Sequence, residues 1–87
     1  MKADKVNINR LLKTAAGQIE GIIKMVDDDR YCIDISNQIL AVQSILKKTN
    51  HEILKAHMQM CVKEAFEKGN DEEKINEIIS LIDKLTK

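Results

Sequence analysis

The sequence predicts an all-α protein with three helices in each chain. Its 87 residues include no proline and no tryptophan, and they contain one Tyr and one Phe. Isoleucine, leucine, lysine and glutamate are plentiful, a composition typical of helices around an aliphatic core. Apolar residues also recur at helical spacing along most of the chain. These observations predict a single small helical domain over residues 1–87, with no internal domain boundary.

The first helix is expected over about residues 4–26. Its apolar positions recur every three or four residues, and they are Ile8, Leu11, Leu12, Ala15, Ile19, Ile22, Ile23 and Val26. Gly17 and Gly21 lie in its interior, where each glycine costs about 1 kcal/mol relative to alanine. We expect another helix to pack closely against these glycines and compensate for that cost.

The second helix is expected over about residues 31–66, a stretch with no Gly or Pro. Asp29, at the end of an acidic run, is the simplest candidate to cap its N-terminus. A spacing near 3.5 predicts a buried seam made by Ile35, Ile39, Val42, Leu46, Ile53 and Met60. Further apolar residues widen this surface, enough for contact with both the first helix and a second subunit.

The third helix is expected over about residues 71–85. Gly69 suits the position after a helix end, and Asn70 followed by Glu73 has the spacing of a capping box. The apolar stripe of this helix consists of Ile75, Ile78, Ile79, Ile82 and Leu85.

Charge and cysteine content narrow the class of protein. The chain has 14 basic and 14 acidic residues, so only a local patch could attract nucleic acid. Two cysteines are too few for a disulfide scaffold. The N-terminus lacks the apolar core of a signal peptide, and no stretch approaches membrane-spanning length. We therefore expect a cytoplasmic protein with reduced thiols and no membrane contact. Without a phosphate loop or a substrate pocket in the pattern, we expect no enzyme.

Two cysteines and one histidine form the most informative constellation. His57 and Cys61 are four residues apart, so they share a helical face. Cys32 falls within roughly 20° of the same line along the helix, but roughly 37 Å from His57. One straight helix cannot bring them together. Two antiparallel copies would place Cys32 of one subunit beside His57 and Cys61 of the other, giving two equivalent sites per dimer.

Two thiolates and one imidazole make a soft set of three ligands. Zinc prefers a fourth ligand, whereas soft thiolates select Cu(I). The residues alone leave another interpretation open, in which two buried cysteines and a hydrogen-bonded histidine simply line the seam of a dimer.

These residues resemble the copper-sensing operon repressor family of small all-helical bacterial regulators, which includes nickel/cobalt and formaldehyde sensors. The likeness runs from about Arg10 onward, through GQIEGIIKMVDDDRYCIDISNQILAVQSILKK and the downstream HMQMC. It implies an antiparallel four-helix-bundle dimer, which pairs into a tetramer and binds operator DNA. It also implies that Cu(I), held by Cys32 of one subunit and by His57 and Cys61 of the other, causes release of the DNA.

The resemblance implies further roles around the metal. Tyr31 and Glu77 match family positions that hydrogen-bond to the ligand imidazole and fix its orientation. The nickel/cobalt branch has a histidine at the position of Cys61 and another near its N-terminus, which MKADKV lacks. A persulfide-sensing branch lacks the histidine found here at position 57. Two alternatives remain: a thiol redox sensor that uses Cys32 and Cys61, and a helical dimer that binds metal without acting on DNA.

The family has no helix-turn-helix, and its basic helix faces contact DNA phosphates. The candidates here are Arg10, Lys13, Gln18, Lys47 and Lys48, of which Lys13, Gln18 and Lys48 match family positions best. Relatives usually carry a basic residue where this chain has Leu11 or Ala16, and Glu20 adds a negative charge nearby. From the residues alone, these lysines could simply form a solvent-exposed helix face. The prediction of DNA contacts therefore depends on the family resemblance.

Overall fold

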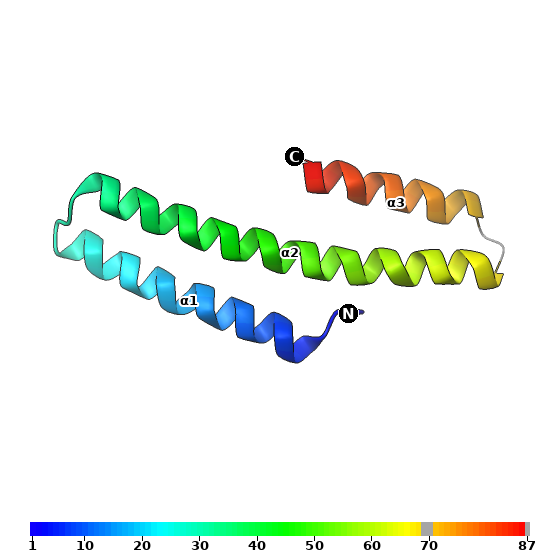
Figure 1. The fold of residues 1–87 in the computed structure, drawn as a ribbon, viewed down its shortest axis with the longest axis horizontal. Helices are drawn as coiled ribbons and strands as arrows, with labels where there is room; N and C mark the ends of the chain where they lie inside the picture. The colour runs from blue at the N-terminus through cyan, green and yellow to red at the C-terminus, as the bar shows by residue number, and fades with distance from the viewer. Residues whose placement is uncertain (69–70, 87) are drawn as a thin grey trace. The chain divides into compact units, whose positions relative to one another are not determined.

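A computed structural model describes residues 1–68 and 71–86, and within these ranges all regular structure is helical. Helix α1 covers Lys5–Asp27, α2 covers Cys32–Lys68 and α3 covers Asp71–Thr86 (Figure 1). The predicted all-α class with three helices is confirmed, and every boundary lies within two residues of its expected position. Gly69 and Asn70, on which the predicted cap and capping box depend, lie outside the described residues.

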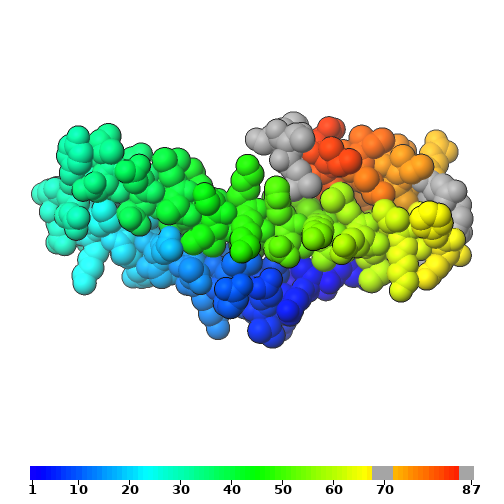
Figure 2. All heavy atoms as spheres, viewed as in Figure 1, coloured from blue at the N-terminus to red at the C-terminus, as the bar shows by residue number. Residues whose placement is uncertain are grey.

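The chain forms two compact units, and α2 contributes to both. One unit is Lys5–Asn50, in which α1 runs beside the N-terminal part of α2. The other combines Met1–Asp4 with His51–Lys87, in which α3 runs beside the C-terminal part of α2. In the space-filling view, the atoms of the two helices meet within each unit (Figure 2).

The unit Lys5–Asn50 has a narrow core. Its buried side chains are Ile8, Leu11 and Ala15 of α1 with Val42 and Thr49 of α2. The Thr49 hydroxyl donates a hydrogen bond to the carbonyl of Ile45 at 2.7 Å, so its burial leaves no unpaired donor. Two members of the predicted seam, Ile39 and Leu46, are exposed in the single chain. One neighbouring helix covers only part of the wide apolar surface of α2.

The two interior glycines of α1 do not pack against another helix in this chain. A Cβ atom built at Gly17 or at Gly21 would meet no atom within 4 Å. The prediction of close packing is therefore wrong for the single chain. Both glycines are exposed on α1, away from the buried stripe that contacts α2.

Helix α1 ends in a hydrogen-bonded reversal built around Asp29. This residue has a φ of 51°, in the left-handed region that Asp tolerates better than most residues. The amides of Asp29 and Arg30 donate to the carbonyls of Val26 and Met25 at 3.1 and 3.0 Å, the pattern of a Schellman motif.

The expectation that Asp29 caps α2 is therefore wrong. The amide of Ile35 donates to the carbonyl of Tyr31 at 3.2 Å, which makes Tyr31 the residue at the N-cap position. Asp29 is the left-handed residue that ends α1. It therefore lies too early in the short connection to cap the N-terminus of α2.

Among the described residues of the unit that contains α3, the buried side chains are Cys61 of α2 and Leu81 of α3. Half-buried residues of both helices, including Ile53 and Ile78, surround them. This pairing brings polar side chains of α2 and α3 together beside Cys61. Over the described residues, no helix has the length and apolar content needed to cross a membrane.

Candidate metal centre

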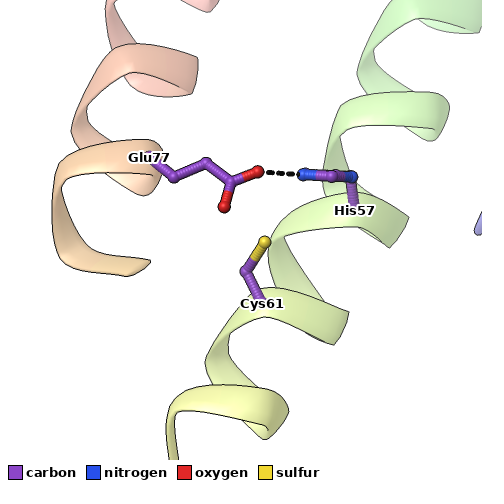
Figure 3. Close-up of side chains that lie close together, drawn as sticks. All are labelled: His57, Cys61 and Glu77. Atoms are coloured by element: carbon purple, nitrogen blue, oxygen red, sulfur yellow. Dashed lines mark hydrogen bonds and ion pairs between the residues drawn. The ribbon is translucent and has the colours of Figure 1, made fainter. Parts of the chain in front are cut away.

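Three potential metal ligands meet between the C-terminal part of α2 and α3. His57 and Cys61 lie one turn apart on the same face of α2, and Glu77 reaches toward them from α3 (Figure 3). One donor atom from each residue lies within 4.8 Å of the others. The four-residue spacing on α2 thus brings the histidine and the thiol to one point, as helical geometry requires.

Glu77 orients the imidazole of His57. The Nε2 atom of His57 lies 2.5 Å from Oε1 of Glu77. An ionised carboxylate can only accept a hydrogen bond, so Nε2 is the donor, and in the neutral imidazole Nδ1 is the nitrogen left with a lone pair. The same hydrogen bond holds the pKa of Glu77 below its ordinary value, assisted by a hydrogen bond from Cys61 and by the charge of Lys74. Such a pairing is typical of histidines that bind metals.

Cys61 is a buried free thiol whose side chain is close to the imidazole. Only 3% of its surface is exposed. Burial raises the pKa of Cys61, and the hydrogen bond and negative charge of Glu77 raise it further, against the opposing charge of Lys74. The thiol is therefore protonated at neutral pH, and a metal ion must displace its proton to bind.

Two further charged residues, missed from the sequence, extend this cluster. Nζ of Lys74 lies 3.1 Å from Oε2 of Glu64 and 3.7 Å from Oε2 of Glu77. Their positions in the sequence carry a signal that could have revealed them. Glu64 continues the face of His57 and Cys61 at helical spacing, and Lys74 precedes Glu77 by three residues.

The remaining predicted residues of the metal site lie in the unit Lys5–Asn50. Cys32 is the first residue of α2, and its thiol is free and exposed. Tyr31 immediately precedes it, and its side chain is exposed as well. The group of donor atoms that meets within the described part of one chain thus consists of His57, Cys61 and Glu77.

The donor set fits a soft metal ion that receives another ligand from outside this cluster. A thiolate and an imidazole nitrogen are both ligands of Cu(I) and of zinc. The His57 side chain is 42% exposed, so an incoming ligand can reach it. A shallow cleft of about 400 Å³ opens beside it, lined also by Ile53, Leu54, Glu77, Ser80, Leu81 and Lys84.

Four of the five predicted DNA-binding residues are exposed, namely Arg10, Lys13, Lys47 and Lys48. Nη2 of Arg10 donates a hydrogen bond to Oδ1 of Asn7 at 2.8 Å, which restrains the guanidinium. All four belong to the unit Lys5–Asn50.

The other two positions of interest on α1 are less accessible. Gln18 is half-buried, and its Oε1 atom is buried without a hydrogen-bond partner. Leu11, at a position where the family resemblance implies a basic residue, belongs to the buried stripe of α1. The departure at position 11 therefore adds apolar packing to this unit instead of positive charge.

Comparisons with known proteins agree on one family. The profile of the metal-sensitive transcriptional repressors matches residues 4–84. The chain is 40% identical over 84 residues to the copper-sensing transcriptional repressor CsoR of Bacillus subtilis (strain 168), an alignment covering 97% of this chain and 83% of that protein. It is 40% identical over 75 residues to CsoR of Mycobacterium ulcerans (strain Agy99), covering 86% of this chain and 63% of that protein.

Two solved structures share the fold. The nickel-responsive transcriptional regulator InrS matches with a TM-score of 0.88 and 27% identity, over 98% of this chain and 96% of that one. The copper-sensing repressor CsoR with Cu(I) from Geobacillus thermodenitrificans NG80-2 matches with a TM-score of 0.83 and 37% identity, over 100% of this chain and 94% of that one.

Proposed function

This chain belongs to the family of metal-sensitive transcriptional repressors, and from this premise we propose that it is a repressor responsive to Cu(I). In the proposed cycle, the metal-free protein binds operator DNA in the cytoplasm and releases it when Cu(I) binds. Cys32 of one subunit, together with His57 and Cys61 of another, provides the ligands. The observation that carries the proposal is the meeting of His57 and Cys61 beside Glu77.

The ligand types favour copper over nickel. Thiolates are soft ligands that select Cu(I), and the proposed site has two of them beside one imidazole. The CsoR proteins, at about 40% identity, are named as copper sensors. The nickel-responsive InrS has the same fold at 27% identity, so the fold alone does not select the metal. The selection depends on the side chains at the site.

The exposed surface of the unit Lys5–Asn50 supports assembly into dimers. Large apolar side chains lie exposed on both of its helices, namely Leu12, Ile19, Ile23 and Val26 of α1 and Ile33, Ile39, Leu40 and Leu46 of α2. A surface this rich in apolar residues gains free energy by being covered. We propose that a second antiparallel copy covers it and supplies the missing thiol, and that two dimers form the tetramer that binds DNA.

Exposed basic side chains on α1 and α2 supply the proposed contacts to DNA. Arg10 and Lys13 of α1 and Lys47 and Lys48 of α2 are exposed to approaching phosphates, and we include Gln18 as a further contact. Phosphate contacts of this kind supply affinity that falls as the salt concentration rises. They fix the position of the protein on the duplex but read little sequence.

The response requires coupling between the metal site and the DNA-binding surface. Bound Cu(I) would link the thiol of one subunit to the imidazole and thiol of the other. Within one chain, the hydrogen bond from Nε2 of His57 to Glu77 connects the imidazole to α3. Coupling free energies of this type are about 1–3 kcal/mol, and linkage requires DNA to weaken copper binding by the same factor.

An anaerobic Cu(I) titration of the protein bound to fluorescent DNA from its own promoter tests the proposal. We expect Cu(I) to lower the fluorescence anisotropy, with no equivalent response to Zn(II) or Ni(II). His57→Ala is expected to keep Cu(I) binding, because two thiolates remain, and to lose most of the release. DNA binding that ignores Cu(I) would refute the copper response. Release of DNA by the His57→Ala variant at wild-type copper levels would refute the role of His57.

A further inference from the structure

The polar residues between the C-terminal part of α2 and α3 form a ladder across the two helices. Successive rungs on α2 are His57, Cys61 and Glu64, and Glu77 and Lys74 face them from α3. The two helices run antiparallel (Figure 1). Glu77 therefore pairs with His57, and Lys74, earlier in α3, pairs with Glu64, later in α2. The ladder thus fixes the position of α3 along α2 next to the proposed metal site.

We infer that Lys74 is a positioning residue that holds the Glu77 carboxylate against His57 and thereby couples the metal site to α3. This inference rests on the proposed function, because the coupling concerns the release of DNA by Cu(I). Lys74 forms ion pairs with Glu64 and Glu77, so we expect its role to lie in transmitting the response.

The two oxygens of the Glu77 carboxylate have different partners. Oε1 accepts the hydrogen bond from Nε2 of His57 at 2.5 Å, and Oε2 lies 3.7 Å from Nζ of Lys74. A carboxylate held at both oxygens has one preferred orientation. Without the cation, Glu77 loses one of the groups that orient it, beside His57 and Cys61, and can turn toward solvent, since its side chain is 37% exposed.

Glu64 anchors the lysine in turn. The contact between Nζ of Lys74 and Glu64 is 3.1 Å, shorter than its contact with Glu77. The side chains of Lys74 and Glu64 are only 23% and 29% exposed, so this pair is less screened by solvent than a surface ion pair. The hydrogen bond to Glu64 also raises the pKa of Lys74, which keeps the cation charged at neutral pH.

The orientation of Glu77 decides which nitrogen of His57 carries the proton. A carboxylate at Nε2 selects the tautomer with hydrogen on Nε2 and leaves Nδ1 as the metal-binding nitrogen. If Glu77 turns away, both tautomers become accessible and the imidazole no longer moves together with α3. The thiols of Cys32 and Cys61 are both retained, so copper is still bound.

The test compares Lys74→Gln with Lys74→Arg and with a matched control, Lys63→Gln. The control removes the same charge from an exposed position on α2 in the same unit. Nitrogen-15 NMR of the metal-free protein reports the tautomer of His57. Competition with a Cu(I) chelator reports copper affinity, and anisotropy reports the ratio of DNA affinities without and with Cu(I).

For Lys74→Gln we expect a loss of the dominant Nε2–H tautomer and a ratio of DNA affinities reduced by about tenfold. Copper affinity is expected to change far less. Lys74→Arg should restore both properties, and Lys63→Gln should match the wild type. Wild-type tautomer populations and a wild-type ratio in Lys74→Gln would overturn the inference.

Two further outcomes separate the possible failures. If wild-type protein ignores Cu(I), the proposed function fails, while the tautomer measurement still decides whether Lys74 positions Glu77. If Lys74→Gln does not fold, Glu64→Gln keeps the lysine and removes its shorter contact, so it should shift the tautomer in the same direction. An unchanged tautomer in folded Glu64→Gln would then overturn the inference.

Discussion

At the residue scale, burial and hydrogen bonding give His57, Cys61 and Glu77 their chemical character. The thiol of Cys61 is nearly enclosed, whereas its neighbour His57 keeps an exposed edge. The carboxylate of Glu77 reaches toward both residues, accepts a hydrogen bond from His57 and helps to raise the pKa of the Cys61 thiol. Burial protects the Cys61 thiol from oxidants in solution. A metal ion that displaces the proton of the thiol can still bind there.

The raised pKa of Cys61 predicts a stability that declines at alkaline pH. The folded state favours the protonated thiol, so this contribution is fully present below the pKa of the unfolded thiol. It is lost as the pH rises through the pKa of the folded one. Urea unfolding at neutral pH and near pH 10 should show a larger loss for wild type than for Cys61→Ser. Cys32→Ser serves as the control and should behave like wild type. Equal losses in all three proteins would contradict the assigned burial.

At the element scale, α1 presents different faces to different neighbours. One stripe, which includes Leu11 and Ala15, is buried in this chain. A flanking stripe of apolar residues is exposed, and a third face combines Gly17 and Gly21 with basic residues such as Lys13. Because 3.6 residues complete one turn, a single helix can supply a core, a proposed subunit contact and a proposed DNA contact.

Replacing the glycines of α1 by alanine should stabilise the single chain. Both positions face open space, so Gly17→Ala and Gly21→Ala should each raise the free energy of unfolding by about 0.5–1 kcal/mol. Urea unfolding measures the change, and Ala16→Gly on the same helix should produce the opposite effect. A loss of stability in the alanine variants would instead place another copy of the chain against these glycines.

At the scale of the whole molecule, the proposed site is complete only when two chains combine. One chain brings together His57, Cys61 and Glu77, while Cys32 belongs to the other compact unit of the same chain. The exposed apolar residues of α1 and α2 supply the surface on which a second chain can pack. Copper binding and assembly are therefore expected to reinforce each other.

Mixing two inactive variants tests whether the site lies between subunits. Cys32→Ser and Cys61→Ser should each lack a complete site. A mixed dimer would contain one intact site, made from Cys32 of one chain and from His57 and Cys61 of the other. After unfolding and refolding together, about a quarter of the sites should be restored by random pairing. Chelator competition measures them, and separately refolded variants serve as the control. No recovery in the mixture would contradict the shared site.

The sequence by itself determined the helices and the local chemistry. Helical periodicity, the absence of proline and the composition were enough to predict α1, α2 and α3, because these signals act over a few residues. The spacing of His57 and Cys61 placed them on one face for the same reason. The resemblance to a family identified Glu77 as a residue near the imidazole, and Figure 3 shows that contact.

Only the tertiary structure decided how the elements meet. The pairing of Lys74 with Glu64 depends on the register of α3 against α2, which no local pattern specifies. Asp29 ends α1 instead of capping α2, because the chain reverses there through a left-handed residue. The glycines of α1 face open space, because α1 packs against α2 through a different stripe, which includes Leu11 and Ala15. Each of these features depends on contacts between residues distant in sequence or on the exact path of a turn.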